Sequence, residues 1–146
     1  MKICIIDHQP IFILGLERYI KSLFDEKMEI ESCQSLYDSY CQCIENYEYI
    51  LVNLELYTHN FLKEVEMGKL KNPKLKLFGL VDPENLEILI HAKLMDFNAL
   101  VLRSALLDEL KLLFSFSEEN RKYYSPEIIE FLNNNMVSNK IQINYE

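Results

Sequence analysis

Short apolar runs alternate along this chain with longer segments in which apolar residues recur at helical spacing. Runs of four to seven residues, apolar on both faces, are typical of buried parallel strands. The runs are Lys2–Ile6, a weaker one at Met28–Ser32, Tyr49–Val52, Leu75–Val81 and Ala99–Leu102. Such alternation predicts an α/β fold, a doubly wound five-stranded parallel sheet with helices on both faces.

Five helices are expected between and after these strands. They are expected from Pro10, at about 35–44, at Thr58–Met67, from Asp82-Pro83 and at Ser104–Phe114, the second having the weakest pattern. Pro10 suits a first helical turn, and Gly68 is expected to end the third helix. Ser104 is expected to cap the fifth helix, which turns Leu106, Leu110, Leu113 and Phe114 inward.

Composition favours one compact domain. Apolar residues make up 49% of the 146 residues and charged residues 26%, a balance typical of globular proteins. The formal net charge of −8 repels phosphate backbones, so these residues alone are a poor nucleic-acid binder. We expect one main domain at 1–118 and a C-terminal linker helix with a tail at 119–146.

The location of the protein is inferred from its first residues and its cysteines. The apolar opening stops at Asp7, too soon for a signal-peptide core or a membrane span. Cys41 and Cys43 lack a second Cys or His pair at zinc spacing, so no metal site is expected there. A reduced, cytoplasmic protein with no membrane contact is the natural interpretation.

Polar residues follow several of the expected strands directly. In a doubly wound sheet, ligands bind at the carboxyl ends of the strands. The candidate site therefore comprises the residues just after each strand, namely Asp7-His8, Asn53, Val81-Asp82 and Arg103.

Four segments carry a family resemblance. They are I-I-D-H-Q-P-I-F-I-L-G-L at 5–16, Y-I-L-V-N-L-E-L at 49–56, A-L-V-L-R at 99–103 and R-K-Y-Y-S-P-E-I-I-E-F-L at 121–132. Together they resemble the receiver domain of LuxR/NarL-type response regulators, across nearly the whole chain. The resemblance implies a flavodoxin-like receiver fold, and the last segment resembles the linker that leads toward a helix-turn-helix domain. This chain contains no such domain, and whether it is a truncation is left open.

The chemistry that the resemblance implies is phosphoryl transfer to an aspartate, with a divalent ion held by carboxylates. Asp7 corresponds to the first acid of the family's acidic pair, but His8 stands at the second. Magnesium rarely chooses a nitrogen ligand. Asn53 stands at the phosphoacceptor position, and a carboxamide has no anionic oxygen for attack on phosphorus. No catalytic residue, metal or cofactor is therefore expected.

The switch positions that the resemblance implies are also altered. The family's Ser or Thr at the end of strand four falls among Gly79, Leu80 and Val81, none of which has a hydroxyl. The aromatic switch position corresponds to Leu100, and the lysine after strand five is Arg103. We therefore expect Gly79 and Leu100 to stand at the family's switch positions without the side chains that respond to phosphorylation.

Glu55 and Asp82 carry carboxylates, but neither comes with the metal ligands that phosphoryl transfer requires. Asp7 is expected either to hydrogen-bond to loop backbone or to pair with Arg103, in preference to binding a metal, since a buried carboxylate needs a partner. Asn53 is expected to hydrogen-bond to Asp7 and nearby backbone.

The leading functional hypothesis is an atypical receiver that regulates signalling or transcription without aspartyl phosphorylation. It would act as a homodimer, through a regulatory protein partner, or through a ligand in the degenerate pocket, and would reach DNA only through a C-terminal helix-turn-helix domain. The alternative is a stand-alone protein-interaction module with no DNA connection. A flavin carrier or enzyme is disfavoured, because the first strand–helix turn, Asp7-His8-Gln9-Pro10, has no glycine or hydroxyl to hold a phosphate.

Overall fold

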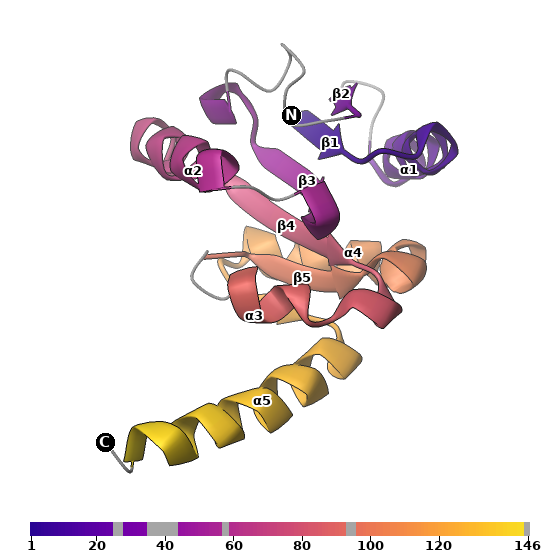
Figure 1. The fold of residues 1–146 in the computed structure, drawn as a ribbon. Helices are drawn as coiled ribbons and strands as arrows, with labels where there is room; N and C mark the ends of the chain where they lie inside the picture. The colour runs from indigo at the N-terminus through magenta and orange to yellow at the C-terminus, as the bar shows by residue number, and fades with distance from the viewer. Residues whose placement is uncertain (25–27, 35–43, 57–58, 93–95, 145–146) are drawn as a thin grey trace.

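The computed structural model describes residues 1–24, 28–34, 44–56, 59–92 and 96–144. A single parallel sheet has helices on both of its faces (Figure 1). The strands are β1 (Lys2–Ile6), β2 (Glu29–Cys33), β3 (Tyr49–Asn53), β4 (Lys76–Val81), β5 (Ala99–Leu102) and β6 (Tyr123–Tyr124), in the order β2-β1-β3-β4-β5-β6. The predicted doubly wound architecture is confirmed.

The prediction of five strands was wrong by one, because β6 extends the sheet. Tyr123 and Tyr124 lie parallel to Ala99 and Leu100 of β5. Backbone N–H groups secure the pairing at both ends, where Tyr123 donates to Asn98 and Ser125 donates to Leu100. A strand of two residues is too short to produce any periodic pattern, so it was hidden inside the expected linker.

The helices are α1 (Pro10–Leu23), α2 (His59–Lys71), α3 (Ile88–Ala92), α4 (Leu106–Glu118) and α5 (Pro126–Asn144). Helices α1 and α4 cover one face of the sheet, and their inward positions include the predicted Leu106, Leu110, Leu113 and Phe114. Helices α2 and α3 and the start of α5 cover the other face, through Val65, Leu89 and Ile128. Beyond that start, α5 extends away from the sheet (Figure 1).

Gly68 does not end α2 as predicted, since the helix continues to Lys71. The glycine instead allows a close approach to a neighbouring turn at Ile44–Asn46. A Cβ at position 68 would lie 3.0 Å from Cγ2 of Ile44. The helix ends before Asn72, whose side chain donates hydrogen bonds to the backbone carbonyls of Glu45 and Tyr47.

Ser104 does not cap the fifth predicted helix. Arg103–Ala105 form a 3₁₀ turn, and α4 begins after Ala105, which makes no side-chain capping bond. Asp108 and Glu109 in the first turn supply the negative charge that favours a helix start.

The fourth predicted helix is split into two short pieces. A 3₁₀ turn at Pro83–Asn85 precedes α3, which begins only at Ile88. The second predicted helix, together with Cys41 and Cys43, lies outside the described residues apart from Ile44. Within the described part of the chain, no helix is long and apolar enough to cross a membrane.

Candidate functional site at the carboxyl ends of the strands

Four parallel strands bring the predicted site residues together. Asp7, Asn53, Asp82 and Arg103 stand at or just after the carboxyl ends of β1, β3, β4 and β5. The strand order reverses between β1 and β3, which is where ligands bind in folds of this type. The backbone N–H of Asp7 donates to Cys33 at the end of β2, which fixes the backbone of Asp7 against that strand.

Asp7 is fully buried, with 0% of the residue exposed, and its two carboxylate oxygens are surrounded by donors. Oδ1 accepts from the Gln9 backbone N–H at 2.9 Å and from Nη2 of Arg103 at 2.9 Å. Oδ2 accepts from Nε of Arg103 at 2.8 Å and, at 3.4 Å, from Nδ2 of Asn53. A carboxylate offers about four acceptor positions, so those of Asp7 are all in use.

Arg103 is the cation of this site, and the predicted pairing with Asp7 is confirmed. Its side chain is only 11% exposed and binds Asp7 through two parallel hydrogen bonds. Nη2 also donates to Oε1 of Gln9 at 2.6 Å, and Nη1 lies 3.8 Å from Oδ1 of Asp82. The guanidinium lies over the ring of Phe12 at 4.0 Å, a cation–π arrangement.

Asn53 is also fully buried and is held from both ends of its amide group. Oδ1 accepts from the Glu55 backbone N–H at 3.0 Å. Nδ2 faces Oδ2 of Asp7 and Nδ1 of His8, each at 3.4 Å. The predicted hydrogen bonding of Asn53 to Asp7 and to nearby backbone is therefore confirmed.

His8, Glu55 and Asp82 form the outer rim of the site. His8 is exposed, and its Nδ1 lies 3.8 Å from Oδ1 of Asp7. Glu55 is exposed and accepts from the Asn85 side chain at 3.4 Å. Burial raises the pKa of Asp82, the nearby carboxylates of Glu55 and Asp7 add to the rise, and Arg103 opposes it.

The switch positions are packed tightly against each other. Gly79 pairs with Leu100 in the register of β4 and β5. A Cβ at position 79 would lie 2.9 Å from Cδ2 of Leu100 and 3.0 Å from the Phe97 ring. Leu100 and Phe97 therefore fill the space that any larger residue at 79 would need. Val81 is buried at the end of β4, beside Asp82.

Two contributors to the site were missed by sequence reasoning. Gln9 and Phe12 both contact the Arg103 guanidinium. Their place at the start of the Pro10 helix, directly after Asp7, was the available signal. No group of three or more His, Cys, Asp or Glu side chains suited to a metal ion occurs among the described residues.

The chain resembles known proteins in structure but not in sequence. No protein-family model matches the sequence, and no curated protein sequence matches it. Solved structures do match. The non-phosphorylated receiver domain of the stress response regulator RcsB from Escherichia coli has a TM-score of 0.63 at 17% identity, covering 86% of this chain and 98% of that one. The chain has the receiver fold.

Two further matches carry the same fold. A LuxR-family two-component response regulator from Aurantimonas sp. SI85-9A1 has a TM-score of 0.71 at 15% identity, covering 93% of this chain and 97% of that one. RcsB in a structure of two dimers bound to two parallel DNAs has a TM-score of 0.71 at 15% identity, where 90% of this chain covers 66% of that one. In this fold, Asp7 directly follows β1 and Asn53 is the last residue of β3.

Proposed function

We propose that this chain is a regulatory domain with the receiver fold that works without aspartyl phosphorylation. The observation that carries the proposal is the bidentate Arg103–Asp7 pair beside a buried asparagine. Its output would come from pairing with a second copy or from docking onto a regulatory protein. Receiver-fold neighbours from LuxR-type regulators support a signalling role over a catalytic one.

Metal binding is disfavoured by the surroundings of Asp7. A divalent ion would need carboxylate oxygens that the Arg103 fork and the Gln9 N–H already occupy. His8, at the position of the second acid, offers a nitrogen that magnesium does not prefer. The guanidinium thus takes the place of a divalent cation as the positive charge at the centre of the site.

Phosphoryl acceptance is disfavoured by Asn53. Its amide nitrogen faces Asp7 and its oxygen is engaged by the Glu55 backbone, so the group is neutral and fixed. Strand β4 ends at Val81, which has no hydroxyl to bind a phosphoryl oxygen. Leu100 is already packed over Gly79, so an inward swing of that position has no space to occupy.

The Arg103–Asp7 ion pair favours a site with one fixed arrangement over a site that switches between two. Arg103 follows β5, and it connects β5 to Asp7 after β1 and, at 3.8 Å, to Asp82 after β4. We infer a site held in one arrangement, from which regulation would pass through partner binding and not through a phosphorylation cycle.

The first experiment exposes the protein to acetyl phosphate or to beryllofluoride with magnesium. The expected result is no added mass and no change in amide resonances around Asn53. An acyl-phosphate adduct in the intact mass, or beryllofluoride-induced shifts at residues 53 and 103, would contradict the proposal.

The second experiment restores the acceptor and then the whole site. Asn53→Asp alone is expected to remain unlabelled, because His8 and Arg103 still prevent ion binding. The triple variant His8→Asp, Asn53→Asp, Arg103→Lys is the matched comparison, since it restores the acids and the lysine together. Robust labelling of the single variant would show that the ion site does not limit the reaction.

The competing function is a stand-alone protein-interaction module. The net charge of −8 favours it over direct nucleic-acid binding by these residues. RcsB dimers bind DNA in the neighbouring structure, and any equivalent contact here would run through a C-terminal helix-turn-helix domain. A DNA-binding assay on the native full-length protein separates the two, since the module hypothesis predicts no retention of any DNA.

A further inference from the structure

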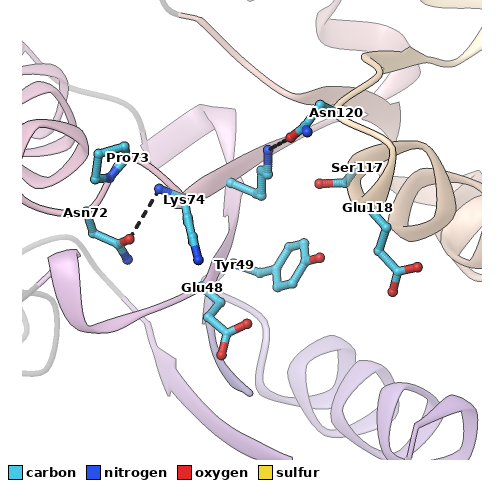
Figure 2. Close-up of a pocket in the computed structure, with 9 residues that line it drawn as sticks. Glu48, Tyr49, Asn72, Pro73, Lys74, Ser117, Glu118 and Asn120 are labelled. Carbon is cyan, nitrogen blue, oxygen red and sulfur yellow. Dashed lines mark hydrogen bonds between the residues drawn. The ribbon is translucent and has the colours of Figure 1, made fainter.

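A cavity of 620 Å³ opens at the opposite end of the sheet from Asp7 and Asn53. It lies where β3 and β4 begin, at Tyr49 and Lys76, and where α4 ends, at Glu118 (Figure 2). The proposed regulatory site uses the far ends of the same strands, so the cavity takes no part in it.

Two side chains with hydroxyl groups, those of Ser117 and Tyr49, line this cavity. Ser117 is 2% exposed, and its Oγ forms no hydrogen bond of normal geometry with any residue that the structure describes, although it lies near enough to the Tyr49 hydroxyl to oppose the rise in the pKa of that group. Tyr49 is also buried, its ring packed edge-on against Phe114 at 4.8 Å. A buried hydroxyl without a partner carries a desolvation cost, so Ser117 is an open position for a polar ligand atom.

Charges of both signs surround these hydroxyls. In Figure 2, Lys74 and Glu118 lie on either side of Tyr49, with Glu48 below it. Lys76 also lines the cavity, but its Nζ donates to Oδ1 of Asn120 at 2.9 Å. Among the described residues, neither Lys74 nor Glu118 forms a salt bridge, so one cation and one carboxylate are available to a ligand.

The local field favours a ligand with an ammonium group in addition to an acid. The carboxyl end of α4, where the helix dipole places negative partial charge, lies at this cavity. Burial is the main cause that raises the pKa of Tyr49; the Glu118 and Glu48 carboxylates add to the rise and Ser117 opposes it. Tyr49 therefore stays protonated as a donor, while Lys74 and Lys76 disfavour a ligand that carries positive charge alone.

We propose that this cavity binds a small zwitterion of the free amino-acid class. The ligand's carboxylate would lie at Lys74 with the Tyr49 hydroxyl as a donor, and its ammonium group at Glu118, with Ser117 meeting a polar atom between them. A purely anionic ligand would be repelled by Glu48 and Glu118, and a purely cationic ligand would be repelled by the two lysines. The inference does not depend on how the site at Asp7 and Asn53 functions.

The test records amide spectra of the isotopically labelled protein while the proteinogenic L-amino acids are added singly. Succinate and putrescine serve as the anion-only and cation-only comparators at matched ionic strength. At least one amino acid is expected to shift the amides of Tyr49, Ser117 and Asn120, while both comparators leave them in place. No shift with any amino acid at millimolar concentration, or equal shifts with succinate or putrescine, would overturn the assignment.

Paired variants locate the binding. Ser117→Ala is expected to weaken the identified amino acid by roughly three- to tenfold, the usual effect of one lost hydrogen bond. Ser115→Ala, an exposed serine of the same helix, is the control and should leave affinity unchanged. Lys74→Gln should also weaken binding, with exposed Lys111→Gln as its control. Equal affinities in each pair would place the ligand elsewhere and refute the proposal.

Discussion

At the scale of single residues, the ion pair between Arg103 and Asp7 is the central interaction of the candidate site. Arginine presents a planar fork that matches both oxygens of a carboxylate, which a lysine ammonium does not. The fork is supported by the Phe12 ring and by Gln9, so its position is fixed by three separate contacts. The pairing was predictable from sequence because both residues follow strands, whereas the supporting contacts depend on how α1 begins.

The first prediction concerns the removal of this cation. Arg103→Ala leaves the buried Asp7 carboxylate without its partner and is expected to lower the free energy of unfolding by about 3 kcal/mol. Arg103→Lys keeps the charge but not the fork, so a smaller loss is expected. Urea denaturation measures both. Arg121→Ala is the control; this exposed arginine pairs with Glu119 and lies over the Phe116 ring, so its loss should change stability much less. A loss as small as that of the control would argue against a structural role for the pair.

At the scale of elements, β6 and the start of α5 are fastened to α4. Glu109 of α4 accepts from the Tyr123 hydroxyl at 2.9 Å and from the Ser125 hydroxyl at 2.6 Å. Ser125 Oγ also accepts from the Leu102 backbone N–H at 3.2 Å. The resemblance predicted a linker here, but a three-element network of this kind gives no local sequence signal.

The second prediction removes the central hydroxyl of that network. Ser125→Ala leaves the buried Leu102 N–H without this acceptor and is expected to cost about 1–3 kcal/mol. The loss should be local, so hydrogen exchange of the Tyr123 and Ser125 amides should accelerate more than that of β1. Exposed Ser104→Ala is the control. Uniform acceleration across the sheet would mean that β6 is not a separately opening unit.

The third prediction is a pH effect in the same network. Burial, with the Glu109 carboxylate adding to it, raises the pKa of Tyr123 from 10 to about 12. The unfolded chain therefore releases this proton first, so the contribution is complete below pH 10 and is lost as pH rises toward about 12. Urea midpoints of the native protein and of Tyr123→Phe, compared across this interval, should converge as pH rises. Parallel curves would contradict the assignment.

The errors in the predicted elements have a common cause. Strand positions and inward helix positions such as Leu110 follow from periodicity, which is a local property of the sequence. For Gly68 and Ser104, residue type alone predicts a role at a helix boundary, and neither residue has that role in the structure. Gly68 allows the close approach of Ile44 to α2, and Ser104 lies in a 3₁₀ turn. Such roles depend on neighbours distant in sequence, which a single chain does not reveal.

At the scale of the whole molecule, α1 presents apolar side chains to solvent on the face of the sheet that it shares with α4. Ile11 is 87% exposed and Leu14 is 51% exposed, while Leu107 of α4 is also exposed. Helices α1 and α4 contact each other. Ile11 and Leu14 are three residues apart and so lie on the same side of α1, and exposed apolar side chains on one helix face can form an interaction surface. They support the proposed pairing with a second copy through helices.

The fourth prediction tests that pairing. Sedimentation velocity should show concentration-dependent dimers of the native protein, and Ile11→Glu combined with Leu14→Glu should shift them to monomer. Leu70→Glu on α2 is the matched control, because Leu70 is 83% exposed on the opposite face of the sheet. A native protein that stays monomeric at high concentration would count against dimerisation.

The two outermost strands of the sheet determine whether a strand from another chain can pair with its edges. Strand β6 is only two residues long, and β2, at the other margin, carries Glu29 and Glu31 among its five residues. Short or negatively charged margins discourage a foreign strand from adding to the hydrogen-bonded ladder. Both outer strands of the described sheet are therefore poor templates for the addition of a further strand, which disfavours strand-by-strand aggregation of the chain.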